Sequence, residues 1–261
     1  MGCDVMPLAI RCEVELHPTV PFSFDGTVHK PSHFPSNDNA YQGGSYWQTM
    51  RFAGRTLGIK MTNLGSVDAP CIQLGIFAAE EMSEDEIQAI SDEVAYRFDL
   101  RADLAEFYSD YADDEILGPV LERWRGMRVM ANASLYESLV ISTVLPNAAV
   151  RRSVQMLENL FRRYGSEVAY DGKQLLAFWP AEAIHETSEE ELRALKVGYR
   201  AKQLKRQAEA FLAGRLGECQ LRTLSSDELK PILMSIYGIG PASVGYLLSG
   251  MFKRYDALDY S

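Results

Sequence analysis

The stretch that decides the fold is Ser235-Ile-Tyr-Gly-Ile-Gly-Pro-Ala-Ser-Val-Gly-Tyr-Leu-Leu248. Gly238-Ile239-Gly240 separates two helical patterns, and Pro241 takes the first position of the second helix, where its missing N–H costs no hydrogen bond. Two glycines allow a tight turn with exposed backbone N–H groups, which together with the start of the next helix form a phosphate-binding site. Ile239 is expected to be buried in the core and so to anchor the turn. The alternative interpretation is a plain tight turn between two packed helices.

A carboxylate follows this turn in the sequence. Asp259 comes nineteen residues after Gly240. A helix over 241–252 with a short return brings that carboxylate back to the mouth of the turn. Asp256 lies in the same return segment and is the competing choice.

A phosphate-binding turn with a carboxylate at this spacing resembles the helix-hairpin-helix DNA glycosylase superfamily. Within it, the similarity is greatest to the branch of 3-methyladenine DNA glycosylase II and 8-oxoguanine DNA glycosylase. The family places its catalytic aspartate after a small apolar residue, as Leu258 precedes Asp259 here. The resemblance therefore implies that Asp259 is catalytic, whereas Asp256 falls where the family varies.

The resemblance also assigns the backbone of the turn. Gly238, Ile239 and Gly240 would bind the DNA backbone beside the damaged base. The carbonyls of Met234, Ile236 and Ile239 would hold a monovalent cation that bridges to a DNA phosphate. No catalytic metal and no required cofactor follow from the resemblance.

A segment near the middle of the chain is similar to the family's first catalytic-domain helix. It runs Leu135-Tyr-Glu-Ser-Leu-Val-Ile-Ser-Thr-Val-Leu-Pro-Asn147. By the resemblance, Asn147 is the wedge that fills the gap left when a base is flipped out of the duplex. Arg152, soon after, would read the base left unpaired on the opposite strand. The alternative for Arg151-Arg152 is a solvated helix face.

A second segment, Val197-Gly-Tyr-Arg-Ala-Lys202, is similar to a stretch of the 8-oxoguanine and 3-methyladenine branches. By the resemblance, Tyr199 inserts into the duplex as a second wedge, and Arg200 joins Arg152 in reading the unpaired base. The alternative for Tyr199 and Arg200 is the ordinary first turn of an amphipathic helix.

Of two positions after the turn, one departs from the family and one matches it. Members that also cut the DNA strand carry a lysine two residues after the second glycine, where it forms a Schiff base with the sugar. Ala242 occupies that position here, which predicts a monofunctional enzyme that uses water. Tyr246 matches a tyrosine of the substrate pocket in the 3-methyladenine branch, although Ala242 lacks the aromatic often found there. The alternative for Tyr246 is a core-facing aromatic side chain.

The missing lysine favours an alkylated purine such as 3-methyladenine as the substrate. Such a base already carries a positive charge and leaves as a neutral molecule, so one carboxylate suffices. Asn147, Arg152, Tyr199 and Arg200 resemble a set that reads cytosine, which favours 8-oxoguanine as the runner-up. A different class of function is a non-catalytic DNA-binding module. A metal hydrolase built on His29 and His33 carries little weight, because both lie in a Pro-rich segment.

The rest of the chain predicts an α+β fold with two domains, an N-terminal antiparallel sheet with helices over 1–118 and a helical glycosylase domain over 119–261. Alternation of apolar and polar residues predicts the strands. No strand is evident after Arg128. The expected strands are 10–16, 46–52, 55–62 and 71–77, with a turn at 63–66 and a loop over 18–44. The expected helices follow Ser83 and cover 103–111, 115–124, 134–145, 148–164, 188–195, 200–213, 227–236 and 241–252.

The charge of the chain is divided unevenly. The net charge of −10 over 261 residues argues against nucleic-acid binding if taken whole. Residues 1–120 hold 7 Lys/Arg and 20 Asp/Glu, a net of −13, whereas residues 121–261 hold 19 and 16, a net of +3. The acidic residues from Glu80 to Glu115 predict a solvated face. The DNA face is therefore expected in the second half, with damaged double-stranded DNA as the partner.

Composition places the chain in a reducing compartment. Four scattered cysteines without a CxxC pair exclude a disulfide scaffold and a zinc knuckle within this chain. No apolar run is long enough to span a membrane. We expect a cytoplasmic monomer that works on the nucleoid. Family members continue past the position of Ser261 with at least one more helix, so we expect the second domain to be cut short.

Overall fold

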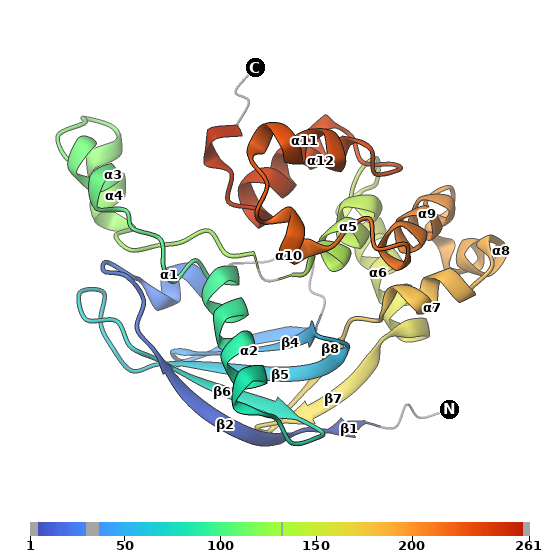
Figure 1. Ribbon diagram of the computed structural model, residues 1–261, viewed down its shortest axis with the longest axis horizontal. Coiled ribbons are helices and arrows are strands. Elements are labelled where there is room, and N and C mark those ends of the chain that lie inside the picture. Colours follow the sequence, from blue (N-terminus) through green and yellow to red (C-terminus); the bar gives the residue numbers. More distant parts are fainter. Residues whose placement is uncertain (1–4, 30–36, 132, 258–261) are drawn as a thin grey trace. The chain divides into compact units, whose positions relative to one another are not determined.

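The computed structural model describes residues 5–29, 37–131 and 133–257 (Figure 1). The chain forms two compact units. The first comprises residues 1–32, 37–132 and 167–175, and the second comprises 33–36, 133–166 and 176–261. The predicted α+β class is confirmed. The boundary expected at 118/119 falls inside α4 (Leu117–Arg123), a helix of the first unit.

A five-stranded antiparallel sheet forms the centre of the first unit. Its order is β2-β6-β5-β4-β3. Its core face follows from alternation: Leu57, Ile59 and Met61 of β5 are almost fully buried, and Ile59 pairs in register with Ile76 of β6. The strands are β2 (Ala9–Leu16), β3 (Asn39–Gln42), β4 (Ser45–Phe52), β5 (Arg55–Asn63) and β6 (Ile72–Ala78).

Helix α2 (Glu84–Arg97) covers one face of this sheet (Figure 1). It begins after Ser83, as expected, at a capping box in which the hydroxyl of Ser83 accepts from the backbone N–H of Glu86 and the Glu86 carboxylate accepts from the N–H of Ser83. Its side chains Ile90 and Val94 belong to the same apolar core as the strands. The small helices of this unit are α1 (Phe24–Val28), α3 (Ala105–Asp110) and α4.

The loop expected over 18–44 is more structured than predicted. It contains α1, capped by Ser23, and the edge strand β3. Apolar alternation could not reveal β3, because all four of its side chains are at least partly exposed.

The expectation of no strand after Arg128 is wrong. Strands β7 (Ser166–Tyr170) and β8 (Lys173–Ala177) form a hairpin, and β1 (Met6–Pro7) pairs with β7 in parallel. The turn Asp171-Gly172 has positive φ at both residues, which is the conformation that an Asp-Gly hairpin turn requires. The hydroxyl of Tyr170 donates to the carbonyl of Gln48 at 2.8 Å, so the hairpin packs on the five-stranded sheet of the first unit.

The second unit is helical. Its helices are α5 (Leu135–Val144), α6 (Val150–Tyr164), α7 (Ala181–Glu186), α8 (Glu189–Leu192), α9 (Arg200–Leu212), α10 (Glu218–Leu221), α11 (Ser226–Met234) and α12 (Pro241–Tyr246). Helix α8 runs into a π-turn at Arg193–Val197, and α12 continues as a π-turn at Leu247–Met251. In the part of the chain that the structure describes, no helix is long and apolar enough to cross a membrane.

Helix α9 is the central element of the second unit, since it contacts α5, α7 and α8. The apolar stripe of α9 is buried at Leu204 and Ala208, whereas Leu212 at its end is 41% exposed. The buried face also includes a polar residue, Gln207, which is 1% exposed.

Candidate functional site

The loop that joins α5 to α6, residues 145–149, carries the predicted wedge. We call it the wedge loop. Asn147 is exposed at its tip and has φ +54°, a left-handed conformation that asparagine tolerates better than most residues. The sequence-predicted wedge therefore lies on the surface of the second unit, at a sharp turn.

Three side-chain hydrogen bonds hold the end of α5 and the wedge loop in place. Arg200 donates from Nε to the carbonyl of Thr143 at 3.0 Å and from Nη2 to the carbonyl of Pro146. The hydroxyl of Ser153 donates to the carbonyl of Val144 at 2.9 Å. Carbonyls at a helix C-terminus have no partner within the helix, so these donors both satisfy them and fix the loop that follows.

Arg200 is consequently a buried residue, only 7% exposed. Its guanidinium donates to two backbone carbonyls of the second unit instead of projecting into solvent. Arg200 does lie in the first turn of α9, as the alternative interpretation has it, but on the buried side of that turn. The geometry makes Arg200 a residue that positions the wedge loop, and its contact with an unpaired base stays a prediction.

Tyr199 lies beside this clamp and is 54% exposed. Two left-handed residues, Lys196 (φ +66°) and Gly198 (φ +64°), turn the chain sharply before α9 and bring the tyrosine to the surface. The guanidinium carbon of Arg200 lies 4.6 Å from the centre of its ring, a cation–π contact. Arg152 is exposed and donates to the carbonyl of Lys196 at 2.6 Å, so it fastens the same turn to α6.

The two glycines of the turn 238–240 have different reasons to be glycine. Gly238 has φ +85°, and a Cβ there would lie 2.5 Å from Nε2 of Gln203. Gly240 has an ordinary φ of −103°, and a Cβ there would meet nothing within 4 Å. The fold therefore requires glycine at position 238. Position 240 borders open space, which would allow a ligand to approach the backbone closely. Ile239 between them is 6% exposed, which confirms that it is buried in the core.

A buried glutamine joins the turn to the wedge loop's helix. Nε2 of Gln207 lies 2.9 Å from Oγ1 of Thr143 and 3.3 Å from the carbonyl of Tyr237. Sequence reasoning missed this residue, although a glutamine inside an apolar helical stripe is a signal of a buried polar contact. Helix α9 therefore holds both elements that the sequence singled out, through Arg200 and Gln207.

The residues predicted for the substrate pocket lie on α12. Ala242 is exposed, and Tyr246 is 79% exposed. The alternative of a core-facing Tyr246 is therefore wrong. Their role in a pocket stays a prediction, and Asp259, the predicted catalytic carboxylate, lies outside the described residues.

The competing carboxylate, Asp256, is described and already has a partner. The hydroxyl of Ser226 lies 2.8 and 3.0 Å from its two carboxylate oxygens. Arg254 fastens the same return segment by donating to the carbonyls of Arg222 at 2.8 Å and Leu224 at 2.6 Å. These contacts give Asp256 a local structural role at the start of α11.

The structure gives no support to a metal hydrolase. Among the described residues, no three His, Cys, Asp or Glu side chains gather to hold a metal ion. His29 packs edge-on against the ring of Tyr41 at 4.5 Å, and His33 lies outside the described residues. The carbonyl of Ile236, one of three assigned to a monovalent cation, accepts from the N–H of Ile239 at 3.1 Å.

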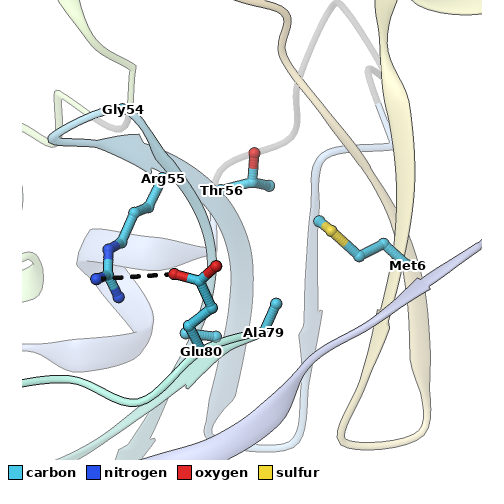
Figure 2. Close-up of a pocket in the computed structure, with 7 residues that line it drawn as sticks. Met6, Gly54, Arg55, Thr56, Ala79 and Glu80 are labelled. Atoms are coloured by element: carbon cyan, nitrogen blue, oxygen red, sulfur yellow. Dashed lines mark ion pairs between the residues drawn. The ribbon is translucent and has the colours of Figure 1, made fainter.

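A cavity of about 290 Å³ in the first unit was the other candidate site (Figure 2). It is lined by Met6, Gly54 and Arg55 together with residues 78–80. The guanidinium of Arg55 lies 3.1 Å from Oε1 of Glu86 and 3.9 Å from Oε2 of Glu80. Its charge is thus offset, and this cavity lacks the positive potential that a DNA phosphate requires.

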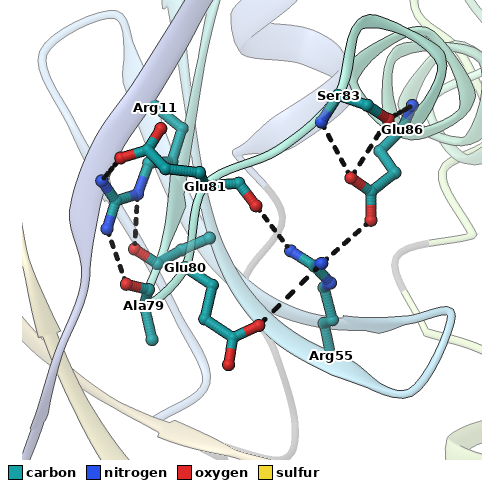
Figure 3. Close-up of polar contacts among 8 residues, drawn as sticks. Arg11, Arg55, Ala79, Glu80, Glu81, Ser83 and Glu86 are labelled. Atoms are coloured by element: carbon teal, nitrogen blue, oxygen red, sulfur yellow. Dashed lines mark hydrogen bonds and ion pairs between the residues drawn. The ribbon is translucent and has the colours of Figure 1, made fainter.

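Ion pairs with arginines of the first unit account for part of the predicted acidic face (Figure 3). Arg11 pairs with Glu81 at 2.5 Å and also donates to the carbonyl of Ala79 at 2.6 Å. Glu80 and Glu81 are exposed, as a solvated face predicts, but Glu93 is 7% exposed and pairs with Arg97 at 2.6 Å. The acidic residues therefore serve the first unit's own structure.

The chain is similar to known DNA glycosylases in sequence and in fold. No family model matches the chain. A protein described as an N-glycosylase/DNA lyase from Methanothermobacter thermautotrophicus is 22% identical over 189 residues, which cover 65% of this chain and 60% of that protein. The structure of the 3-methyladenine DNA glycosylase from Archaeoglobus fulgidus matches 92% of this chain and 79% of that chain, at 16% identity and a TM-score of 0.71.

An 8-oxoguanine glycosylase/lyase from Clostridium acetobutylicum has a similar structure. The match covers 98% of this chain and 83% of that chain, at 18% identity and a TM-score of 0.68. The chain has the fold of the DNA glycosylases. The fold that the resemblance implies is thus confirmed, and the similar structures include both a 3-methyladenine glycosylase and an 8-oxoguanine glycosylase/lyase. The matched region spans less than two thirds of the N-glycosylase/DNA lyase.

Proposed function

We propose that the protein is a monofunctional DNA glycosylase, which flips a damaged purine out of duplex DNA and hydrolyses its N-glycosidic bond. The observation that carries the proposal is the clamped wedge loop: an exposed Asn147 held by Arg200 and Ser153, on a chain with the glycosylase fold. Flipping costs unstacking energy, and a rigid wedge that fills the gap offsets that cost.

The chemistry would follow from one carboxylate. As the N-glycosidic bond breaks, positive charge develops on the sugar, and a carboxylate in a water-poor site stabilises that charge and orients the attacking water. We assign this role to Asp259. Members of the resembled family that also cut the DNA strand carry a lysine at the position of Ala242. This chain therefore has no amine there to form a Schiff base.

We propose an alkylated purine as the substrate, since a cationic base leaves without a general acid. One observation favours 8-oxoguanine as the second candidate: Arg152, which donates to the carbonyl of Lys196, and Tyr199, which follows the same turn, are both exposed and offer a polar and an aromatic group. We further propose that the partner is double-stranded DNA, that the protein acts as a monomer, and that the turn holds a monovalent cation.

The test is base release from duplexes that carry 3-methyladenine, 7-methylguanine or 8-oxoguanine. We expect release of the methylated bases without strand cleavage, and Asp259→Asn to slow release by at least about a hundredfold. Asp256→Asn is the matched control and should keep the rate. Release of 8-oxoguanine alone would overturn the substrate class. Retained DNA binding with no release from any duplex would favour the binding-module alternative.

A further inference from the structure

A cavity of about 370 Å³ opens beside the glycine turn, entirely within the second unit. Helix α9 contributes Lys202 and Arg206 to its wall, and the segment after α9 contributes Arg215. The residues that lead into the turn, Ser235 to Tyr237, form its other side. The cavity is therefore contiguous with the backbone that precedes Gly238.

The charge of this cavity is positive. Its wall holds three cations and one carboxylate, Glu209, which pairs with Arg206 at 3.1 Å. Lys202 and Arg215 have no ion pair with any residue that the structure describes, and both are exposed. This basic concavity contrasts with the net charge of the whole chain and has the sign that a phosphate needs.

The rest of the wall is aromatic and aliphatic. The ammonium of Lys202 lies 5.5 Å from the centre of the Tyr237 ring, which is 49% exposed. Leu216 and Ile236, both nearly buried, add apolar surface. A nucleotide combines an anionic phosphate with a flat, partly apolar base. Two neighbouring cations and an aromatic ring are a common binding surface for it.

We propose that this cavity binds a second segment of the DNA strand, holding the phosphate of a nucleotide beside the one at the glycine turn. The proposal deepens the proposed function and rests on it, because it extends the DNA face along α9. Lys202 and Arg215 would contact phosphate oxygens, and the Tyr237 ring would pack against the sugar or base. Ser235 and Tyr237 line the cavity and directly precede the turn, so one strand can pass from the turn into the cavity.

The test compares two charge-matched double variants of the full chain. Lys202→Gln with Arg215→Gln empties the cavity of its two unpaired cations. Lys230→Gln with Arg162→Gln removes two exposed cations that do not line it. Affinity for a lesion-bearing duplex is measured by fluorescence anisotropy across a salt series, with thermal midpoints as a check on folding. The cavity variant should bind roughly tenfold more weakly at low salt. The slope of log affinity against log salt should become shallower by about 0.9, the loss of one phosphate contact.

A second variant tests the aromatic wall. Tyr237→Phe should keep the affinity and Tyr237→Ala should lower it severalfold, because only the ring is removed while the backbone carbonyl bound by Gln207 remains. Equal affinity and equal salt slope for the two double variants would overturn the proposal. Failure of the proposed function shows separately, as no base release by the unaltered protein at saturating DNA.

Discussion

At the scale of single residues, the two glycines of the turn serve different purposes. Gly238 holds a left-handed backbone against Gln203, whereas Gly240 has ordinary dihedral angles and open space beyond its Cα. A fold that needs only a tight turn has no reason for a glycine at position 240. The open space beside it is the feature of the turn that favours a bound phosphate over plain packing.

Alanine at each glycine separates folding from binding. Gly238→Ala should lower the free energy of unfolding by about 1–2 kcal/mol, because a left-handed alanine is strained and its Cβ displaces Gln203. Gly240→Ala should leave the free energy of unfolding within about 0.5 kcal/mol and still weaken DNA binding, because its Cβ enters the space that the phosphate would occupy. Urea denaturation and anisotropy on the same samples measure both. A Gly240→Ala protein with unchanged DNA affinity would return the turn to a purely structural role.

Arg200 shows how a residue's role depends on what surrounds it. The resemblance gives it a base-reading role, which stays a prediction. In the structure its guanidinium is buried and donates to the carbonyls of Thr143 and Pro146. Those carbonyls lie more than fifty residues away, and they are backbone atoms, which any sequence supplies. Side-chain type therefore could not reveal them.

At the scale of elements, α9 connects the wedge loop's helix to the glycine turn. Gln207 bonds the side chain of Thr143 on α5 and the backbone of Tyr237. A buried amide is costly to leave without partners, and removal of one partner costs more than removal of both. The strength of this contact therefore measures how strongly α5 and the glycine turn are coupled.

A double-mutant cycle measures that coupling. Gln207→Met should lower the free energy of unfolding by about 1–3 kcal/mol, because the hydroxyl of Thr143 and the carbonyl of Tyr237 lose their buried partner. Thr143→Val removes the hydroxyl without leaving a void. The double variant should lose less than the sum of the two single losses, by at least about 0.5 kcal/mol. Strict additivity in chemical denaturation would show that the two side chains do not interact.

The elements differ in how far the sequence predicts them. The strands β2, β4, β5 and β6 were predictable from their apolar sequence patterns. Burial alternates along the second half of β2, whereas β4 and β6 each contain five consecutive buried residues. The hairpin of β7 and β8 was missed, because its strands are five residues each and helical patterns flank them. Its turn, Asp171-Gly172, was the available signal. The helix starts after Ser83 and at 188 were predictable, because the capping box at each depends only on contacts within one helical turn.

At the scale of the whole molecule, the acidic charge is used by the structure itself. Carboxylates close capping boxes in both units and pair with arginines such as Arg55 and Arg97. The basic groups that remain exposed beside the glycine turn belong to the second unit, whose segments carry most of the positive charge. A net charge of −10 is thus compatible with a local DNA-binding face.

The capping carboxylates predict how the whole molecule responds to acid. Hydrogen bonds from Ser188 and Ser225 hold the pKa of Glu191 and Glu228 below the ordinary value of 4.5. A carboxyl group whose pKa is lowered by folding stabilises the folded state above pH 4.5, and this contribution is lost as the pH falls through the folded pKa. Below pH 4.5 the unfolded chain binds more protons than the folded one. The midpoint of thermal unfolding should therefore fall as the pH is lowered from about 6 to about 3.

Glutamine at both positions isolates this effect, because it can still accept the capping hydrogen bond but does not titrate. Glu191→Gln with Glu228→Gln should have a lower thermal midpoint than the unaltered protein at pH 6, where the charged caps are at full strength. The difference should shrink as the pH falls below 4.5, since protonation removes the same charges from the unaltered protein. Scanning calorimetry over the pH series measures both curves. Parallel curves would mean that these caps act through geometry alone and that acid unfolding has its origin in other carboxylates.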